Sequence, residues 1–550
     1  MADPDPVVIP DLLSPSPSSR IAVEETKLAI ALAFVGGVSG GLFGEALARA
    51  TVAPSSWESS SFANDLFVPN FVALCFKIPL GDGNASVATA HLVKLVTHPP
   101  SDVAVVDFRR AILGELDASE SLHEELSKLY ALLCRFRSLL EGATGVGKWD
   151  PNRRQLDLLA SIKEIIDCMA LGFAKASSGL RRLSEFATRV QAGEPYHSLA
   201  DLLRYDAELA TLNLQIKVGA DGKIRGFQLV SVEENANNPF VSSAPRRWLA
   251  KVELFLRGYS FGDGEIMARL VDAVYEGLAD EVVPFVQLLG EIELYLGALG
   301  FRDQARAAGL AVCLPKLVEA SAPRELTELF NPLLLAHGIK PIPCNVADDR
   351  HDTTLLVTGP NSGGKTRLLQ TLGLTQLLAQ NGLFIPARSG SIALAPALVV
   401  SLLQDTQADQ VEGRLGMELI RIRALFEHLP PGAMVILDEL CSGTNPSEGE
   451  EIFELVIRML AKLHPQAMIT THFLAFAARL ELERKITDLR FLQVALGPDH
   501  EPTYQFAPGV ASTSLAGHAA ARLGVTGDQL MFVIERNIAQ SNAKKDRTVG

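Results

Sequence analysis

The spacing of hydrophobic positions divides the chain into segments with different secondary structure. Between Asp102 and about Arg204, apolar residues recur every three or four positions, which is the period of a helix with one buried face. Helical spacing returns over Arg247–Leu256 and Asp263–Phe301. The sequence therefore predicts a long, mainly helical region. Its clearest helices are expected over Ser121–Glu141, Arg154–Ala176 and Gly179–Ala192.

Strict alternation interrupts this helical pattern. Leu212–Val218 and Lys223–Val232 alternate apolar and polar residues, which is typical of half-buried strands. Gly219-Ala-Asp-Gly222 lies between the two runs and is a turn signal. The sequence thus predicts a β-hairpin inserted among the helices.

A third pattern begins near residue 327, where short and almost wholly apolar runs end in polar loops. Asp352–Thr358, Ala433–Leu437 and Ala467–Thr471 are predicted to be buried strands, and Arg367–Leu383 a helix. Strands that alternate with helices indicate an α/β domain with a parallel sheet.

Together these patterns predict a multidomain protein, in which an α-helical domain with an inserted β-hairpin precedes an α/β domain. The Pro/Ser/Asp-rich beginning and the polar end of the chain are expected to be loose. The predicted divisions are a disordered tail over 1–20, a mixed region over 21–101, the helical domain over 102–326, the α/β domain over 327–535 and a flexible tail over 536–550.

Composition narrows the classes of function. The chain has 64 Asp and Glu against 50 Lys and Arg, a net charge of −14, so it has no general attraction to nucleic acid. Any DNA contact must come from a local basic surface. The six cysteines are scattered without a C-x-x-C pair. They favour a reducing compartment, here taken as the cytoplasm, and argue against a zinc site.

One stretch, Leu28–Gly44, contains no charged side chain. Its length is near the lower limit of a membrane-spanning helix, about 17 residues. Ala, Ser and Gly dilute its hydrophobicity, and Glu45 follows at once. We therefore expect a buried, Gly-rich segment and no membrane contact, with a membrane tether as the weaker alternative.

The strongest candidate chemistry lies in the run Gly359-Pro-Asn-Ser-Gly-Gly-Lys-Thr366. It matches G-x-x-x-x-G-K-[ST] between a predicted strand and a predicted helix, which is the context of a phosphate-binding loop. Lys365 is expected to reach the β- and γ-phosphates, and Thr366 to place its hydroxyl on Mg²⁺. The predicted nucleotide-binding residues are Gly359, Pro360, Asn361, Ser362, Gly363, Gly364, Lys365 and Thr366.

Polar residues follow the two later predicted strands. Asp438 and Glu439 end the run Ala433–Leu437, as in a Walker B motif, and His472 follows the run ending at Thr471. Asp438 is expected to hold Mg²⁺, and Glu439 to orient or deprotonate the attacking water. Because parallel strands share one ligand-binding edge, His472 is expected to contact the γ-phosphate.

Together these residues resemble the MutS family of DNA mismatch-repair ATPases, a branch of the ABC ATPase superfamily. The resemblance is nearest to the second, recombination-associated MutS subfamily. It implies an ABC-type ATPase domain after a helical lever and clamp region, with ATP and Mg²⁺ as ligands. The segments that carry it are Thr358–Thr366, Gln380–Ala387, Leu437–Gly449 and Thr470–Phe473.

The resemblance also implies a homodimer, in which each ATP lies between two ATPase domains. One subunit supplies the phosphate loop and the other a signature segment, which matches Gln407–Glu418 here. This segment lacks the family's Ser-Thr-Phe and is shortened, although Glu418 is kept. The altered segment puts the efficiency of hydrolysis in doubt. Gly413 and Arg414 are candidate replacements for the missing serine.

The regions around the ATPase domain depart from the family pattern. The sequence before the helical region is expected to be too short for an intact mismatch-recognition domain, and a C-terminal nuclease-like domain is not expected. Phe43-Gly-Glu45 spells the mismatch-sensing tripeptide inside an apolar run, and we interpret it as chance.

Basic residues cluster on and after the predicted hairpin, which makes it the candidate contact for duplex or branched DNA without sequence specificity. The alternative is a solvated charged surface. We therefore expect a DNA-binding ATPase in repair or recombination, or an ATP-gated scaffold for protein partners. The candidate DNA contacts are Lys217, Lys223, Arg225, Arg246 and Arg247; further cations on the preceding helices are Arg153, Arg154, Lys163, Lys175, Arg181, Arg182 and Arg189.

Overall fold

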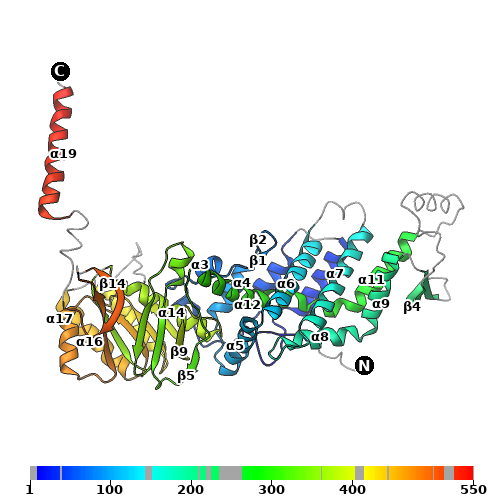
Figure 1. The fold of residues 1–550 in the computed structure, drawn as a ribbon, viewed down its shortest axis with the longest axis horizontal. Coiled ribbons are helices and arrows are strands. Elements are labelled where there is room, and N and C mark those ends of the chain that lie inside the picture. The colour runs from blue at the N-terminus through cyan, green and yellow to red at the C-terminus, as the bar shows by residue number, and fades with distance from the viewer. Residues whose placement is uncertain are drawn as a thin grey trace.

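The computed structural model describes most of the chain, and Figure 1 shows an elongated molecule with helices at one end and a β-sheet at the other. The described residues are 9–36, 40–142, 151–208, 211–218, 224–233, 263–360, 362–402, 414–441, 445–498, 501–512 and 525–548.

Helices form most of the chain before residue 308. Asp102 and Ser119 begin two of them, because each side chain accepts a hydrogen bond from an amide of the first turn. The helices are α1 (Val23–Gly36), α2 (Leu42–Arg49), α3 (Val68–Cys75), α4 (Thr89–Thr97), α5 (Val103–Ala118), α6 (Glu120–Glu141), α7 (Pro151–Gly172), α8 (Arg181–Gln191), α9 (Glu194–Glu208), α11 (Asp263–Val282) and α12 (Pro284–Ala307).

Short strands and a single 3-10 turn complete this half. Strands β3 (Thr211–Val218) and β4 (Ile224–Glu233) pair antiparallel, and Figure 1 places them at the end of the molecule opposite the sheet. Strands β1 (Pro79–Leu80) and β2 (Gly83–Asn84) form a small second pair, and Ser59–Ser61 is the 3-10 turn.

The α/β part is built on a six-stranded sheet in the order β10-β11-β12-β8-β13-β14. All neighbours are parallel except β13 and β14. The strands are β8 (Thr354–Thr358), β10 (Leu398–Ser401), β11 (Met434–Leu437), β12 (Gln466–Thr470), β13 (Leu489–Leu496) and β14 (Pro502–Pro508).

Helices cover both faces of this sheet. Alternate residues of β11 point to opposite faces: Met434 and Ile436 join the core on the α14 side, and Val435 and Leu437 join the core under α16 and α17. This alternation follows from the two-residue period of a strand. The helices are α14 (Lys365–Gln380), α15 (Arg414–His428), α16 (Pro446–Ala461) and α17 (Leu474–Glu483).

A smaller four-stranded sheet, in the order β5-β9-β6-β7, adjoins this part. Its strand β6 (Arg324–Leu329) runs across the predicted domain boundary at 326/327, so that boundary was wrong by about one strand. Sequence patterns mark element boundaries poorly, because the strand pairs with residues far along the chain. The other elements are β5 (Lys316–Val318), β7 (Cys344–Asp348), β9 (Ser389–Ala393) and α13 (Pro332–Ala336).

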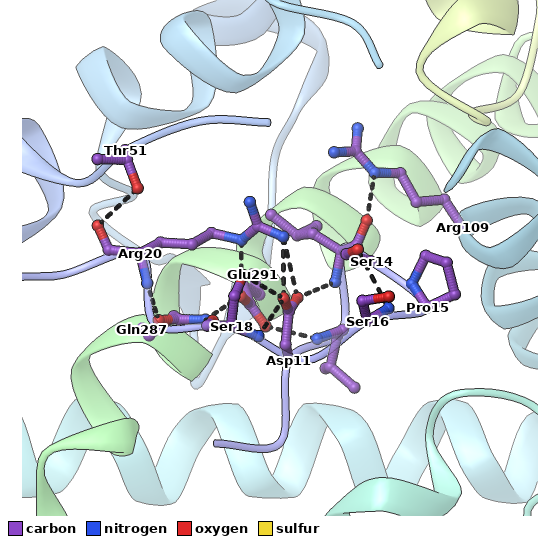
Figure 2. A network of polar contacts seen from close by, with 12 residues as sticks. Asp11, Ser14, Pro15, Ser16, Ser18, Arg20, Thr51, Arg109, Gln287 and Glu291 are labelled. Carbon is purple, nitrogen blue, oxygen red and sulfur yellow. Dashed lines mark hydrogen bonds and ion pairs between the residues drawn. The ribbon is translucent and has the colours of Figure 1, made fainter. Parts of the chain in front are cut away.

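Residues 9–20 are packed into the helical part, which corrects the prediction of a disordered tail over 1–20. Leu12 and Leu13 are fully buried. The backbone is held by α12, since the amide of Leu12 donates to Glu291 Oε2 at 2.8 Å. Figure 2 shows Asp11 and Arg20 beside Glu291, with Arg20 Nη2 2.9 Å from Asp11 Oδ2. Hydrogen bonds and ion pairs to buried residues thus order a segment whose Pro/Ser/Asp-rich composition predicts disorder.

At the other end, α19 (Gly527–Thr548) is helical through most of the tail predicted over 536–550. Figure 1 shows this helix projecting away from the sheet. Its exposed apolar side chains are Leu530, Met531, Phe532, Val533, Ile534 and Ile538.

The apolar run Leu28–Gly44 is divided between α1 and α2. Phe43 of the tripeptide Phe43-Gly-Glu45 is fully buried against the ring of Phe136, so it is not a side chain that could wedge into DNA in this structure. Among the described residues, no single helix has both the length and the apolar composition of a membrane crossing, although the bent pair Ala268–Val282 and Pro284–Ala307 meets these criteria jointly.

Candidate nucleotide-binding site

The glycine-rich loop lies between the central strand β8 and the buried helix α14. Gly359 has φ 141° and Gly364 has φ 87°, both in the region that favours glycine. A Cβ on Gly359 would lie 2.6 Å from Val494 Cγ2. The loop therefore needs glycine both for its backbone angles and for its close approach to β13. Asn361 lies outside the described residues.

Lys365 is the first residue of α14 and is buried inside the loop. Its Nζ donates to the carbonyl oxygens of Gly359 at 2.9 Å and Pro360 at 3.2 Å. Burial lowers the pKa of the ammonium from its ordinary value, and the nearby carboxylates of Glu439 and Asp438 oppose that shift. The loop thus encloses a buried cation that donates to two of its own carbonyl oxygens.

Asp438 stands at the end of β11 with a threonine on each carboxylate oxygen. Thr366 Oγ1 donates to Asp438 Oδ2 at 2.6 Å, which joins the loop helix to the strand. Thr470 Oγ1, at the end of β12, donates to Asp438 Oδ1. The geometry therefore brings together Thr366 and Asp438, the two residues predicted to hold Mg²⁺.

Glu439 and His472 lie at the same edge of the sheet. β12 runs between β11 and β8, so His472 leaves the sheet between the Walker B carboxylates and the phosphate loop. Its imidazole is exposed beside the ring of Phe473. Glu439 has φ 50°, and its amide donates to Thr470 Oγ1 at 2.8 Å. Lys365, Asp438, Glu439 and His472 thus all lie at one edge of the sheet.

A cavity of about 300 Å³ opens beside the loop and was not predicted from the sequence. Gly364, Arg367 and Tyr504 line it together with apolar residues of the segment before β7. The Tyr504 ring lies so close to Gly364 that a Cβ there would be 3.1 Å from the ring. An apolar, aromatic cavity next to a phosphate loop is suited to a nucleobase.

The residues present at this edge fit Mg²⁺ and ATP. The Thr366 hydroxyl and Asp438 carboxylate are hard oxygen donors of the kind that Mg²⁺ prefers. Lys365 supplies a cation, and the N-terminus of α14 supplies partial positive charge for phosphate oxygens. The loop has no side chain on Gly363 or Gly364 to fill the space beside it.

Comparison with known proteins shows which families the chain resembles. Residues 355–538 match MutS domain V, a range that contains the loop, both carboxylates and His472. Over a longer span the chain is 29% identical to an endonuclease MutS2 of Thermus thermophilus, covering 76% of this chain. Both matches support the MutS family resemblance that the motifs predicted.

Two further MutS relatives match a shorter part of the chain. Endonuclease MutS2 of Thermomicrobium roseum is 31% identical over 47% of this chain, and that of Streptococcus mutans is 33% identical over 48%. The chain spans 54% of the length of the Thermus relative and 32% of each of the other two.

The segment predicted to match the family's signature segment is described only from Arg414 onward. Glu418, on α15, accepts a hydrogen bond from the amide of Cys441 at 2.8 Å. Cys441 follows Glu439 by two residues and also has a positive φ, 61°. Glu418 therefore ties the signature helix to the turn that carries the Walker B carboxylates. Gly413 lies outside the described residues.

The predicted DNA contacts are mostly outside the described part of the chain. Lys223, Arg246 and Arg247 are not described, and Lys217 and Arg225 are placed only as backbone positions on β3 and β4. The hairpin lies far from the nucleotide site along the molecule (Figure 1). Its distance from the phosphate loop means that any DNA there is separate from the ATP site.

Most cations on the preceding helices have partners within the chain. Arg153, Lys163 and Arg181 pair with carboxylates one helical turn away. Arg154 is buried and donates to backbone carbonyls, including that of Leu140 at 2.9 Å. Arg182 donates to carbonyls of the N-terminal segment. These contacts favour a structural role for the helix cations over a DNA-binding role.

Proposed function

We propose that this MutS-family protein binds and hydrolyses Mg–ATP at the edge formed by β8, β11 and β12. The observation that carries the proposal is the 2.6 Å contact between Thr366 Oγ1 and Asp438 Oδ2 beside the buried Lys365. Residues from two separate motifs meet there, in the arrangement that a metal and a triphosphate need.

In the proposed reaction a bond forms between the oxygen of water and the γ-phosphorus, and the bond from that phosphorus to the β–γ bridging oxygen breaks. Glu439 accepts the proton of the attacking water, Lys365 binds the β- and γ-phosphates, and His472 donates a hydrogen bond to the γ-phosphate. Thr366 and Asp438 hold Mg²⁺. The metal supplies charge neutralisation on the phosphates when bound.

We further propose that the protein acts as a homodimer in which hydrolysis moves the helical arms. Glu418 supports this idea, because it joins the signature helix to the Walker B turn. Closure of a second subunit on the signature segment would then displace the turn that carries Asp438 and Glu439. Such a change at a subunit interface is a common form of switching in proteins.

The best-supported target of this movement is duplex or branched DNA, in repair or recombination and without sequence specificity. The position of the β3–β4 hairpin at the far end of the helices is consistent with a DNA-contacting arm, and the names of the relatives point to a nucleic-acid substrate for those proteins. Lys217, Lys223 and Arg225 are the proposed phosphate contacts on this arm.

A second candidate function is an ATP-gated scaffold that binds protein partners and no DNA. Two observations favour it: the net charge of −14, and the pairing of Arg153, Lys163 and Arg181 with neighbouring carboxylates. A surface whose cations are already paired offers little to DNA phosphates.

ATPase activity measured without DNA and with duplex, mismatched and branched DNA separates these proposals. The DNA-binding reading predicts that one or more of these DNAs changes the turnover rate. Hydrolysis that no DNA alters, with no retention on DNA at low salt, would favour the scaffold. Absence of Mg–ATP binding would contradict both.

A further inference from the structure

Thr470 touches both Walker B carboxylate residues with a single hydroxyl group. Its Oγ1 donates to Asp438 Oδ1 and accepts the amide proton of Glu439, at 2.8 Å from that nitrogen. The side chain is fully buried at the end of β12. A threonine hydroxyl has one proton to donate, so its donor capacity here is used on Asp438.

The contact to Asp438 fixes the orientation of that carboxylate. Thr366 bonds one oxygen and Thr470 bonds the other, from two different elements of the sheet edge. With both oxygens held, the carboxylate cannot rotate without breaking a hydrogen bond. The oxygen that faces Thr366 therefore stays on the side where Mg²⁺ is proposed to bind.

The contact to Glu439 fixes a backbone conformation that is costly for a residue with a side chain. Glu439 has φ 50°, and such left-handed residues cost about 1–3 kcal/mol and persist only where surrounding structure holds them. The hydrogen bond to Thr470 satisfies the Glu439 amide in that conformation. Without this acceptor, the amide would lack the one partner that the structure gives it.

We propose that Thr470 is a positioning residue that sets the geometry of Asp438 and Glu439 together, through its hydroxyl group. This inference rests on the proposed ATPase site. His472 follows Thr470 by two residues. A contact at His472 that displaces the end of β12 would therefore also displace the Thr470 hydroxyl, and with it the Asp438 carboxylate and the Glu439 backbone. Thr470 thus connects the proposed γ-phosphate contact to the metal and water positions.

Three substitutions test the proposal in the full-length chain. Thr470→Val keeps the shape and removes the hydroxyl, and Thr470→Ser keeps the hydroxyl and removes a methyl group. Thr375→Val is the matched control, because Thr375 is equally buried and its hydroxyl donates only to the carbonyl of Thr371, within α14. If the melting temperature of Thr470→Val lies well below that of Thr375→Val, the Thr470→Ala variant is measured in its place.

The first readout is the Mg²⁺ concentration that gives half-maximal binding of a non-hydrolysable ATP analogue. Thr470→Val is expected to need about 10- to 100-fold more Mg²⁺, the usual effect of losing the hydrogen bond that orients a metal-binding carboxylate. Turnover at saturating Mg²⁺ should fall by about the same factor, with KM for ATP within about threefold. Thr470→Ser should restore both to within about threefold, and Thr375→Val should change neither.

A wild-type Mg²⁺ midpoint in Thr470→Val would overturn the proposal. So would equal damage from serine and valine, because that result would indicate packing by the methyl group and no role for the hydroxyl. If the wild-type protein binds Mg²⁺ with the analogue but releases no phosphate, the proposed hydrolysis fails. The Mg²⁺ midpoint of Thr470→Val still decides the role of Thr470 in that case.

Discussion

Tyr504 brings an aromatic ring to the phosphate loop from β14, the antiparallel strand at the sheet's edge. The residue has φ 58°, and this left-handed conformation turns the ring toward Gly364 and the 300 Å³ cavity. Tyr504 is 43% exposed, so the fold does not need it as a core residue. An exposed aromatic side chain held in a strained conformation beside a cavity suggests a role in binding.

Replacing Tyr504 should weaken nucleotide binding and leave the chemistry nearly unchanged. Stacking of a base on an aromatic ring contributes about 1–3 kcal/mol, so Tyr504→Ala should raise the dissociation constant for ATP by about tenfold or more. Tyr504→Phe keeps the ring and should bind ATP as the wild type does. Titration with a fluorescent ATP analogue measures both. Equal ATP affinity of the wild type and both variants would show that the base does not bind in this cavity.

Residues within a contiguous motif could be predicted from the sequence, and residues that reach the site from elsewhere could not. Lys365, Thr366 and Asp438 were identifiable because spacing along the chain defines their motifs, and parallel strands bring the motifs to one edge. Tyr504 carries no such signal. Its place depends on the pairing of β13 with β14 and on one left-handed residue. Thr470 was part of a quoted motif, but its double contact required coordinates.

Helix α12 shows how a single element holds the helical part together. It is buried along most of its length and still carries ionisable side chains toward its neighbours. Glu293 Oε2 accepts from the amide of Ala88, and Glu293 Oε1 accepts from Tyr130 Oη. Burial raises the pKa of Glu293 to about 7, although these two hydrogen bonds lower it. The folded state therefore favours the protonated carboxyl near neutral pH.

This shift predicts a pH-dependent stability. Between an unfolded pKa of 4.5 and a folded pKa of about 7, the folded state keeps a proton that the unfolded state has lost. The contribution of Glu293 to stability is therefore full at low pH and is lost as pH rises through this window. The slope is at most about 1.4 kcal/mol per pH unit.

Glu293→Gln removes this titration, so its free energy of unfolding relative to the wild type should rise from about pH 5 to about pH 8. Urea titrations at several pH values measure the difference. Glu124→Gln, on the exposed face of α6, is the matched control and should differ from the wild type by a constant amount. A constant difference for Glu293→Gln as well would show that its carboxyl does not titrate in this window.

The N-terminal segment shows why some elements could not be predicted. Residues 9–20 look disordered by composition, because proline, serine and aspartate dominate them. They are ordered by distant partners: Gln287 accepts from the amide of Arg20 at 2.8 Å, and Arg109 Nε donates to the carbonyl of Leu13 at 3.1 Å (Figure 2). By contrast, the long helices follow their predicted ranges closely, since helical spacing is a local property.

In the whole molecule, helix α14, which begins at the proposed ATP site, and the β3–β4 hairpin lie far apart (Figure 1). Any influence of DNA on hydrolysis must therefore pass through the helices between them. The core allows this, because residues of α14 and of the helical part belong to one continuous hydrophobic cluster. Closely packed interiors have low compressibility and transmit displacement.

If the hairpin contacts DNA, binding should weaken steeply with salt. Replacing Lys217, Lys223 and Arg225 together by glutamine should lower retention on duplex DNA and reduce the slope of log affinity against log salt by about 3, or roughly 1 per lost phosphate contact. The matched control replaces Arg153, Lys163 and Arg181, which are paired within their helices. Equal salt slopes in both triple variants would exclude the hairpin as the DNA contact.

Phosphate release measures hydrolysis of Mg–ATP at the shared sheet edge. The proteins to compare are the wild type, Lys365→Ala, Glu439→Gln and the control Glu451→Gln, whose carboxylate is exposed on α16. We predict that Glu439→Gln binds ATP normally and loses about 100-fold or more of the turnover, as expected for a general base. Lys365→Ala should lose binding, and Glu451→Gln should match the wild type. Phosphate release by Glu439→Gln at the wild-type rate would contradict the account.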